Sequence, residues 1–322
     1  MKPSILPVPA PSPLFTKPSS RPTGAEARRV WEAGEAARGQ RPESALRLFG
    51  KALRRDRWAL ASGIFLLLVA LASLVAPWIS PYGPNEANPS LRLGGIGTPG
   101  HLLGLDQQGR DMLTRLLWGG RVALPMAFIP VAAATVVSLL LGMVAGYYRR
   151  GIGELVMRLL DILYAFPAVL LAIAIAGILG PGMTNVMISI FIVLLPYMTR
   201  VVYTSTLTVA EEDFVTAARS SGAGDASILL REILPNVTAP MIVYATLSLG
   251  LQVVFAAGLS FLGLGVQPPT ADWGVMTSDG RSVLALAPHV SMVPGVLLLL
   301  VALSFNLLGD GLRDALDPKL RV

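Results

Sequence analysis

Long apolar runs separated by short polar segments fill most of this chain. A helix needs roughly 20 predominantly apolar residues to cross the hydrocarbon core of a bilayer. None of the runs shows the two-residue alternation of a membrane β-strand. The pattern therefore predicts an all-α polytopic membrane protein with six transmembrane helices, at about residues 59–79, 121–148, 157–179, 183–205, 237–262 and 289–309.

The apolar runs contain small residues and helix-bending prolines. Gly142 and Gly146 form a G-x-x-x-G pair, which lets two helices approach closely. Pro196 and Arg200 interrupt the second half of the fourth run, and further prolines stand at positions 125, 130 and 167. Each of these residues is compatible with ordinary packing inside a helix bundle.

Only one acidic residue, Asp161, lies within an apolar run. An intramembrane acid often marks a functional site. Here Arg158 stands three residues earlier and is expected to pair with Asp161 at the membrane interface. The scarcity of charges within the runs argues against a carrier driven by protons or sodium.

The distribution of basic residues predicts how the chain crosses the membrane. The chain is 53% hydrophobic and 14% charged, whereas soluble domains are about a quarter charged. Twelve of the 26 basic residues precede residue 58, and most others flank apolar runs, which does not resemble a nucleic-acid-binding surface. With the N-terminus inside, the inner segments hold 21 basic residues and the outer segments 5. We expect both termini in the cytoplasm and no nucleic-acid partner.

Four regions follow from this topology. Because its first 25 residues are rich in Pro and Ser, the N-terminal region is expected to be disordered. The next region begins with a segment in which Leu46, Phe49 and Leu53 share one helical face, either as an amphipathic helix on the membrane or as the first turns of the first span. The predicted regions are a cytoplasmic extension at 1–45, the amphipathic helix, first span and outer loop at 46–120, the core transmembrane domain at 121–310, and a cytoplasmic tail at 311–322.

Two outer segments contain turn and cap signals. In the first, Asp106 is expected to cap a short helix that presents Met112, Leu113, Leu116 and Leu117 on an apolar side. The second begins "GLGVQPPTADWG", which must end a helix and turn the chain.

The sequence contains few candidates for catalytic chemistry. It has no cysteine, and its two histidines, His101 and His289, are far apart. It contains no G-x-x-x-x-G-K-[ST] phosphate-binding motif and no nucleophile–base pattern. We therefore expect a membrane subunit, transporter or channel, non-catalytic, with no metal site and no cofactor of its own.

One polar segment, at 207–236, separates the fourth and fifth runs. Asp213 is expected to cap a helix starting at Phe214, Gly222 and Gly224 to end it, and a second helix to run from about Ala226, with an apolar stripe before Pro235. Small residues in the first helix would let another protein approach closely. The residues alone leave two interpretations open, a docking element and a connector packed beneath its own bundle.

A resemblance distinguishes between these interpretations. Ala217-Ala218-Arg219-Ser220-Ser221-Gly222-Ala223, followed by Ile233-Leu234-Pro235-Asn236, resembles the "EAA loop" of permease subunits of ABC importers. Thr216 stands where that family often has Glu. The resemblance implies a coupling loop that fits a groove on the ATP-binding subunit, formed by Asp213, Phe214, Thr216, Ala217, Ala218, Arg219, Gly222, Ala223, Ile233, Leu234 and Pro235.

Further motifs resemble one branch of this family. "GLDQQGRD" at 104–111 is similar to the G-T-D-x-x-G-R-D segment of dipeptide/oligopeptide/nickel permeases, with Leu105 in place of Thr. The segments at 259–274 and 305–320 resemble those of the second, C-type, permease subunit. The motif residues expected to organise the outer loop, without touching substrate, are Asp106, Gly109, Arg110 and Asp111.

The resemblance implies a type I importer permease fold in a bacterial cytoplasmic (inner) membrane. It also implies a second homologous permease, two ATP-binding subunits that hold ATP and Mg, and an extracellular or periplasmic substrate-binding protein. Di- or oligopeptides are the expected cargo. The alternatives are nickel chelates or another small solute and, in a different class, a self-sufficient ion-coupled carrier or channel.

Overall fold

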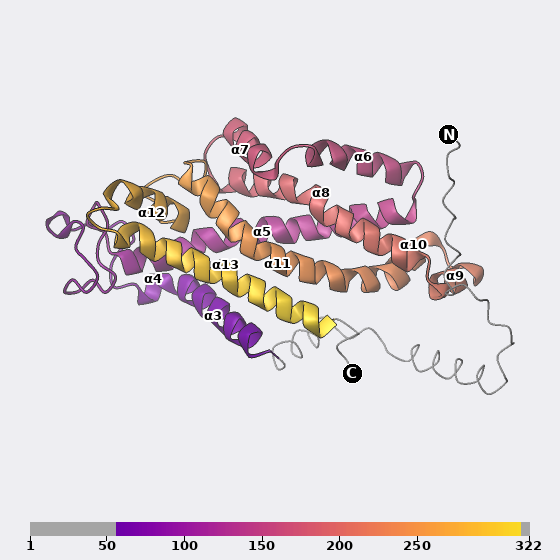
Figure 1. Cartoon of the computed structure of the whole chain (residues 1–322), viewed down its shortest axis with the longest axis horizontal. Coiled ribbons are helices and arrows are strands. Elements are labelled where there is room, and N and C mark those ends of the chain that lie inside the picture. Colours follow the sequence, from indigo (N-terminus) through magenta and orange to yellow (C-terminus); the bar gives the residue numbers. More distant parts are fainter. Residues whose placement is uncertain (1–55, 317–322) are drawn as a thin grey trace, which may run out of the picture. The chain divides into compact units, whose positions relative to one another are not determined.

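The computed structural model describes residues 56–316, and these form helices joined by loops (Figure 1). The predictions for residues 1–45, for the amphipathic segment at 46–55 and for the last residues of the tail lie outside this range. No strand occurs within the described range, which confirms the all-α prediction. The elements are α3 (Arg57–Leu74), α4 (Ala76–Ile79), η2 (Pro89–Leu91), α5 (Met112–Tyr147), α6 (Ile152–Tyr164), α7 (Ala168–Leu179), α8 (Met183–Ala210), α9 (Asp213–Ser220), α10 (Asp225–Ser227), a π-helix (Ile228–Ile233), α11 (Leu234–Phe261), α12 (Trp273–Gly280), η4 (Arg281–Val283) and α13 (His289–Leu316).

Five helical segments of the described range are long and apolar enough to cross a membrane. The third predicted span is different, because α6 and α7 meet at an angle of 86°. Pro167 lies at this break, where it has no N–H to donate and disfavours helical geometry in the residue before it. The span predicted at 157–179 is thus a bent pair of helices, and six spans result if this pair counts as one.

Helix α5 is longer than predicted. The short helix expected to precede it is its first turns, since α5 begins at Met112 and continues through Pro125 and Pro130. The predicted cap was also wrong. Asp111, not Asp106, caps α5, and its Oδ2 accepts a 2.7 Å hydrogen bond from the backbone N–H of Thr114.

Helices α5 and α8 pack closely through the predicted G-x-x-x-G pair. A Cβ on Gly142 would lie 2.6 Å from the Cβ of Val202, and one on Gly146 would lie 2.7 Å from the Cβ of Thr206. There is no room for a side chain at either position, so glycine at both positions permits this close contact between α5 and α8. The core beside it contains fully buried Val186, Ile190, Met198, Val202 and Met241.

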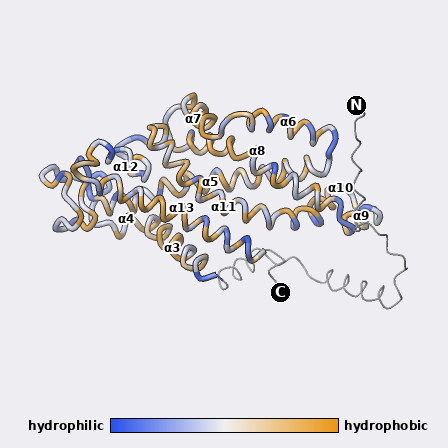
Figure 2. The backbone as a smooth tube through the Cα atoms, viewed as in Figure 1, coloured by the Kyte–Doolittle hydropathy of each residue, from blue (hydrophilic) through white to orange (hydrophobic). Residues whose placement is uncertain are grey.

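Apolar side chains also cover the outside of the bundle. Leu68 is 58% exposed, and Ile178 is 86% exposed. Figure 2 shows hydrophobic residues along the long helices and hydrophilic ones gathered toward their ends. This distribution is that of helices surrounded by lipid. In Figure 1, α9 and α10 lie at one end of these helices, and α12 with the loop at 80–111 lies at the other.

Candidate functional site

The polar segment forms a short helix, α9, at one end of the bundle. It begins one residue earlier than predicted, with Glu212 in the N-cap position and no side chain bonded to the free N–H groups. The prediction that Asp213 is the cap was therefore wrong. Asp213 instead lies in the first turn, where its negative charge interacts favourably with the helix dipole.

Gly222 ends α9, as predicted. Its φ of +84° reverses the chain, and its N–H donates to the carbonyl of Arg219 at 3.0 Å. The N–H of Ala223 donates to the carbonyl of Ala218 at 3.1 Å. These two bonds form a Schellman motif, which satisfies carbonyls at the end of the helix.

The chain then becomes helical again at Asp225 and stays helical as far as Phe261. The second helix predicted from about Ala226 therefore continues into the fifth span. A π-helix at 228–233 precedes Pro235, and the N–H of Leu234 is bonded to the carbonyl of Leu229. Pro235 falls in the first turn of α11, where this wider turn accommodates a residue without an N–H.

One side of this segment is buried and the other is open. Val215, Ile228 and Ile233 are fully buried and anchor the segment to the bundle. A Cβ on Gly222 would meet no atom within 4 Å. Of the other predicted residues, Ala218, Ala223, Leu234 and Pro235 are half-buried, while the exposed ones are Asp213, Phe214, Thr216, Ala217 and Arg219.

The contact between this segment and the end of α5 was missed in the sequence. Asp225 accepts hydrogen bonds from the hydroxyls of Tyr147, at 2.7 Å, and Tyr148, at 2.9 Å. Arg219 donates to the Tyr147 hydroxyl at 3.2 Å, and its guanidinium lies 5.5 Å from the centre of that ring. The hydrogen bond to Asp225 raises the pKa of Tyr148 above its usual value. The sequence feature that could have indicated this contact is a pair of tyrosines at the end of an apolar run, which is typical of a membrane interface.

An ion pair adds to this connection. Arg149, which follows the tyrosines, bonds to Glu211 at 2.7 Å. Glu211 directly follows α8, so three elements meet at this end through polar side chains. The segment is thus tied to α5 and α8 while its outer face stays open.

A buried charged cluster occupies the opposite end. Arg110 Nε lies 2.6 Å from Asp106 Oδ2, and Arg115 Nε lies 3.5 Å from the same oxygen. Arg115 is 1% exposed and also donates to the carbonyls of Pro84 and Pro269. These bonds join the loop at 80–111 to the loop before α12.

The other two motif residues also serve this loop. Asp111, besides capping α5, bonds through Oδ1 to His101 Nδ1 at 2.9 Å. Gly109 has a φ of +82°, and a Cβ there would lie 2.7 Å from the carbonyl carbon of Asn88. The structure thus brings Asp106, Gly109 and Arg110 together, with Asp111 beside them.

Helix α12 completes this end of the bundle. Asp272 caps it by accepting from the N–H groups of Gly274 and Val275, both at 3.1 Å. Burial raises the pKa of the Asp272 carboxyl. The indole of fully buried Trp273 donates to the Leu116 carbonyl at 2.9 Å, which fixes α12 against α5.

The long apolar helices and the polar elements at their ends define a polytopic membrane protein. A family model described as the binding-protein-dependent transport system inner membrane component matches residues 138–322, and a model of the N-terminal TM domain of oligopeptide transport permease C matches residues 44–94. The chain belongs to this family of inner membrane components. It is a permease subunit of an ABC importer, and ATP hydrolysis belongs to separate subunits.

Curated relatives match most of the chain. The di/tripeptide transport system permease protein DppC of Pseudomonas aeruginosa is 44% identical over 285 residues, which cover 86% of this chain and 93% of that protein. The glutathione transport system permease protein GsiD of Pectobacterium atrosepticum is 40% identical, covering 85% and 91%. The dipeptide transport system permease protein DppC of Alkalihalophilus pseudofirmus is 43% identical, covering 84% and 89%.

A solved structure shares the fold. A chain of the MetNI methionine ABC transporter superposes with a TM-score of 0.53 and 20% identity, over 64% of this chain and 98% of that one. This likeness confirms the predicted type I importer permease fold.

Proposed function

We propose that this permease imports short peptides and that α9, with the residues after it, is its coupling element. The relatives described above are named for dipeptides, di- and tripeptides, and glutathione, which is itself a tripeptide. The complex would contain a second homologous permease, two ATP-binding subunits with ATP and Mg, and an external substrate-binding protein. The α9 end and both termini would face the cytoplasm, as the basic residues predict.

The observation that supports the coupling role is the open face of α9 on a segment tied to the spans. Thr216, Ala217 and Gly222 are exposed, and their small side chains let a partner surface approach closely. A partner bound there moves α9. The bonds from Asp225 to the two tyrosines then pass that movement to α5.

At the other end, the proposed role of the charged cluster is to hold the outer loops in a fixed shape. Asp106, Arg110 and Asp111 are buried and already bonded within the chain. Buried groups of this kind are available to organise a surface for the binding protein, not to touch the cargo.

The coupling role is tested with Ala217→Trp in the co-expressed complex. The indole blocks close approach, so recovery of the ATP-binding subunits with the tagged permease should fall by about tenfold or more. Ala217→Ser is the matched control and should recover them normally. Gly222→Trp should also weaken docking, but its φ of +84° adds backbone strain, so Ala217 gives the cleaner result. Normal recovery and transport in Ala217→Trp would refute the coupling role.

The cargo is tested separately, in proteoliposomes that contain the whole complex and are given its loaded binding protein. Radiolabelled dialanine, glutathione and a nickel–histidine chelate are offered in turn. ATP-dependent uptake of either peptide is the expected result. Uptake of the chelate alone would replace peptides by metal chelates as the cargo.

A further inference from the structure

An ion pair joins α6 to α8 within the apolar part of the bundle. Arg200 of α8 lies 2.5 Å from Asp161 of α6, so the predicted local pairing of Asp161 with Arg158 was wrong. Arg158 bonds instead to Glu154, one turn away. The Arg200 guanidinium also lies 4.5 Å from the centre of the Tyr164 ring, and the centres of the Tyr164 and Tyr197 rings are 5.0 Å apart.

This pair is exposed although it lies within the spans. The side chains of Arg200 and Asp161 are 43% and 53% exposed. Arg200 precedes the end of α8 at Ala210 by ten residues, or about 15 Å of helix. Its neighbour Thr199 bonds to Ser138, well before the end of α5. Two ionised groups at this depth are costly against lipid, so their open side faces an aqueous path or another subunit.

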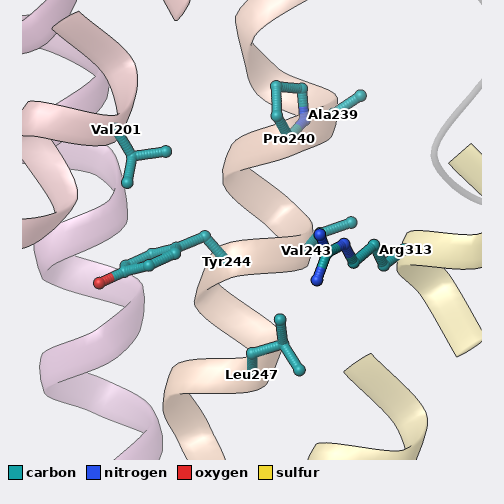
Figure 3. A pocket seen from close by; sticks show the side chains of 7 residues that line it. All are labelled: Val201, Ala239, Pro240, Val243, Tyr244, Leu247 and Arg313. Atoms are coloured by element: carbon teal, nitrogen blue, oxygen red, sulfur yellow. The ribbon is translucent and has the colours of Figure 1, made fainter. Parts of the chain in front are cut away.

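A pocket is lined by Val201, the residue that follows Arg200 on α8. Val201 lines it together with residues of α11 and with Arg313 of α13, and its volume is about 500 Å³, within the range of small-molecule sites. Figure 3 shows the Tyr244 ring extending from α11 toward α8 and Arg313 entering from the other side. The pocket therefore combines an apolar wall with a phenol and a second cation. The remaining lining residues are Ala239, Pro240, Val243 and Leu247.

We propose that Asp161 and Arg200, with the pocket lined by Val201, contact the peptide as it crosses the membrane. A free peptide has an ammonium group at one end and a carboxylate at the other. The ammonium would lie beside Asp161 and the carboxylate beside Arg200, so that each charge of the pair gains a second partner of opposite sign. The pocket would take a side chain. This inference rests on the proposed import of peptides.

Both groups have bonding capacity to spare. A guanidinium has five N–H donors and a carboxylate about four acceptor positions. Among the described residues, the side chains of Arg200 and Asp161 make one hydrogen bond, the one to each other. The pair can therefore accept a zwitterion without first breaking.

The test uses the reconstituted complex and the double variant Asp161→Asn/Arg200→Gln. Removing both charges leaves no unpaired ion, so a pair that only holds α6 to α8 is dispensable. A pair that contacts the peptide is needed for transport. Uptake of dialanine from its loaded binding protein should then fall by at least about tenfold, with assembly and basal ATP hydrolysis unchanged. The matched control is Glu154→Gln/Arg158→Gln, an exposed pair on the same helix, which should transport normally.

A second variant, Val201→Trp, fills the pocket and leaves the ion pair intact. It should also slow dialanine uptake without changing assembly. Normal uptake by the assembled double variant, or by Val201→Trp, would overturn the inference. Loss of the second permease from the double variant, with normal uptake in Val201→Trp, would assign the pair to the interface between the permeases and overturn it too. Failure of the proposed function is a separate result, in which the unmodified complex takes up no peptide.

Discussion

At the α12 end, Asp106 is buried and bonded to two guanidinium groups, whereas at the α9 end Asp225 is exposed and bonded to two tyrosine hydroxyls. A buried, charged network fixes one geometry, because every partner that moves leaves a charge unpaired in a medium of low dielectric. Exposed hydrogen bonds exchange with water at little cost. The difference indicates a rigid α12 end and an α9 end whose contacts can rearrange.

The largest expected effect comes from Asp106→Ala. It leaves Arg110 and Arg115 without their shared carboxylate, which costs about 3–5 kcal/mol and roughly 10 °C in melting temperature. Thermal unfolding of the purified protein in detergent measures this. Glu154→Ala, which breaks an exposed pair, should leave the melting temperature unchanged. Equal melting temperatures for the two variants would contradict a rigid α12 end.

Two glycines with nearly the same backbone angle allow the α12 end and the α9 end to be compared directly. Gly109 has a φ of +82° and Gly222 a φ of +84°, but only Gly109 faces another part of the backbone, at Asn88. Gly222→Ala should cost about 1–2 kcal/mol, the strain of the left-handed conformation alone. Gly109→Ala adds a collision to that strain and should lower the melting temperature clearly more. The reverse order would contradict the packing described for the loop.

Trp273→Phe should have a smaller effect than Asp106→Ala. A smaller aromatic ring replaces the indole, and it has no N–H to donate to the carbonyl of Leu116, at a cost of about 1–3 kcal/mol. The melting temperature again gives the measure. An unchanged value would mean that the α12–α5 contact does not depend on this bond.

The smallest effect on stability is expected at the α9 end, from Tyr147→Phe/Tyr148→Phe. Both hydrogen bonds to Asp225 are lost, but the groups are exposed to water, so the melting temperature should hardly change. Stimulation of ATP hydrolysis by the loaded binding protein should fall, by roughly fivefold if these bonds link α9 to α5. Tyr82→Phe is the control, because it removes a hydroxyl at the other end, where it donates to the Gly100 carbonyl at 2.9 Å. Full stimulation in the double variant would show that the link runs elsewhere.

The sequence predicted features that depend on local composition. Five spans were recognisable because a helix in lipid needs a long apolar run. The end of α9 at Gly222 was recognisable because a positive φ favours glycine. The bend between α6 and α7 was not, although Pro167 was noted, because residues 157–179 have the same hydropathy whether the helix is straight or broken.

Contacts between distant segments were missed or wrongly predicted. Arg158 was a plausible partner for Asp161 by spacing, but Arg200, 39 residues away, bonds to it in the fold. Asp225 and the tyrosines are likewise separated by 77 and 78 residues. Asp106 and Asp111 are both good cap residues, and only the path of the loop decides which one meets α5. The roles of the coupling loop and the outer loop remain predictions.

The unbroken helical stretch from Asp225 to Phe261 has a mechanical consequence. Its 37 residues make a rod of about 55 Å, anchored by Asp225 at one end. A rod of that length turns a tilt of about five degrees at its base into a displacement of roughly 5 Å at its tip. The π-helix at 228–233 lies near the base of this rod, where the hydrogen bonds join residues five apart instead of four. A small movement at the polar end would thus reach the far side of the membrane magnified.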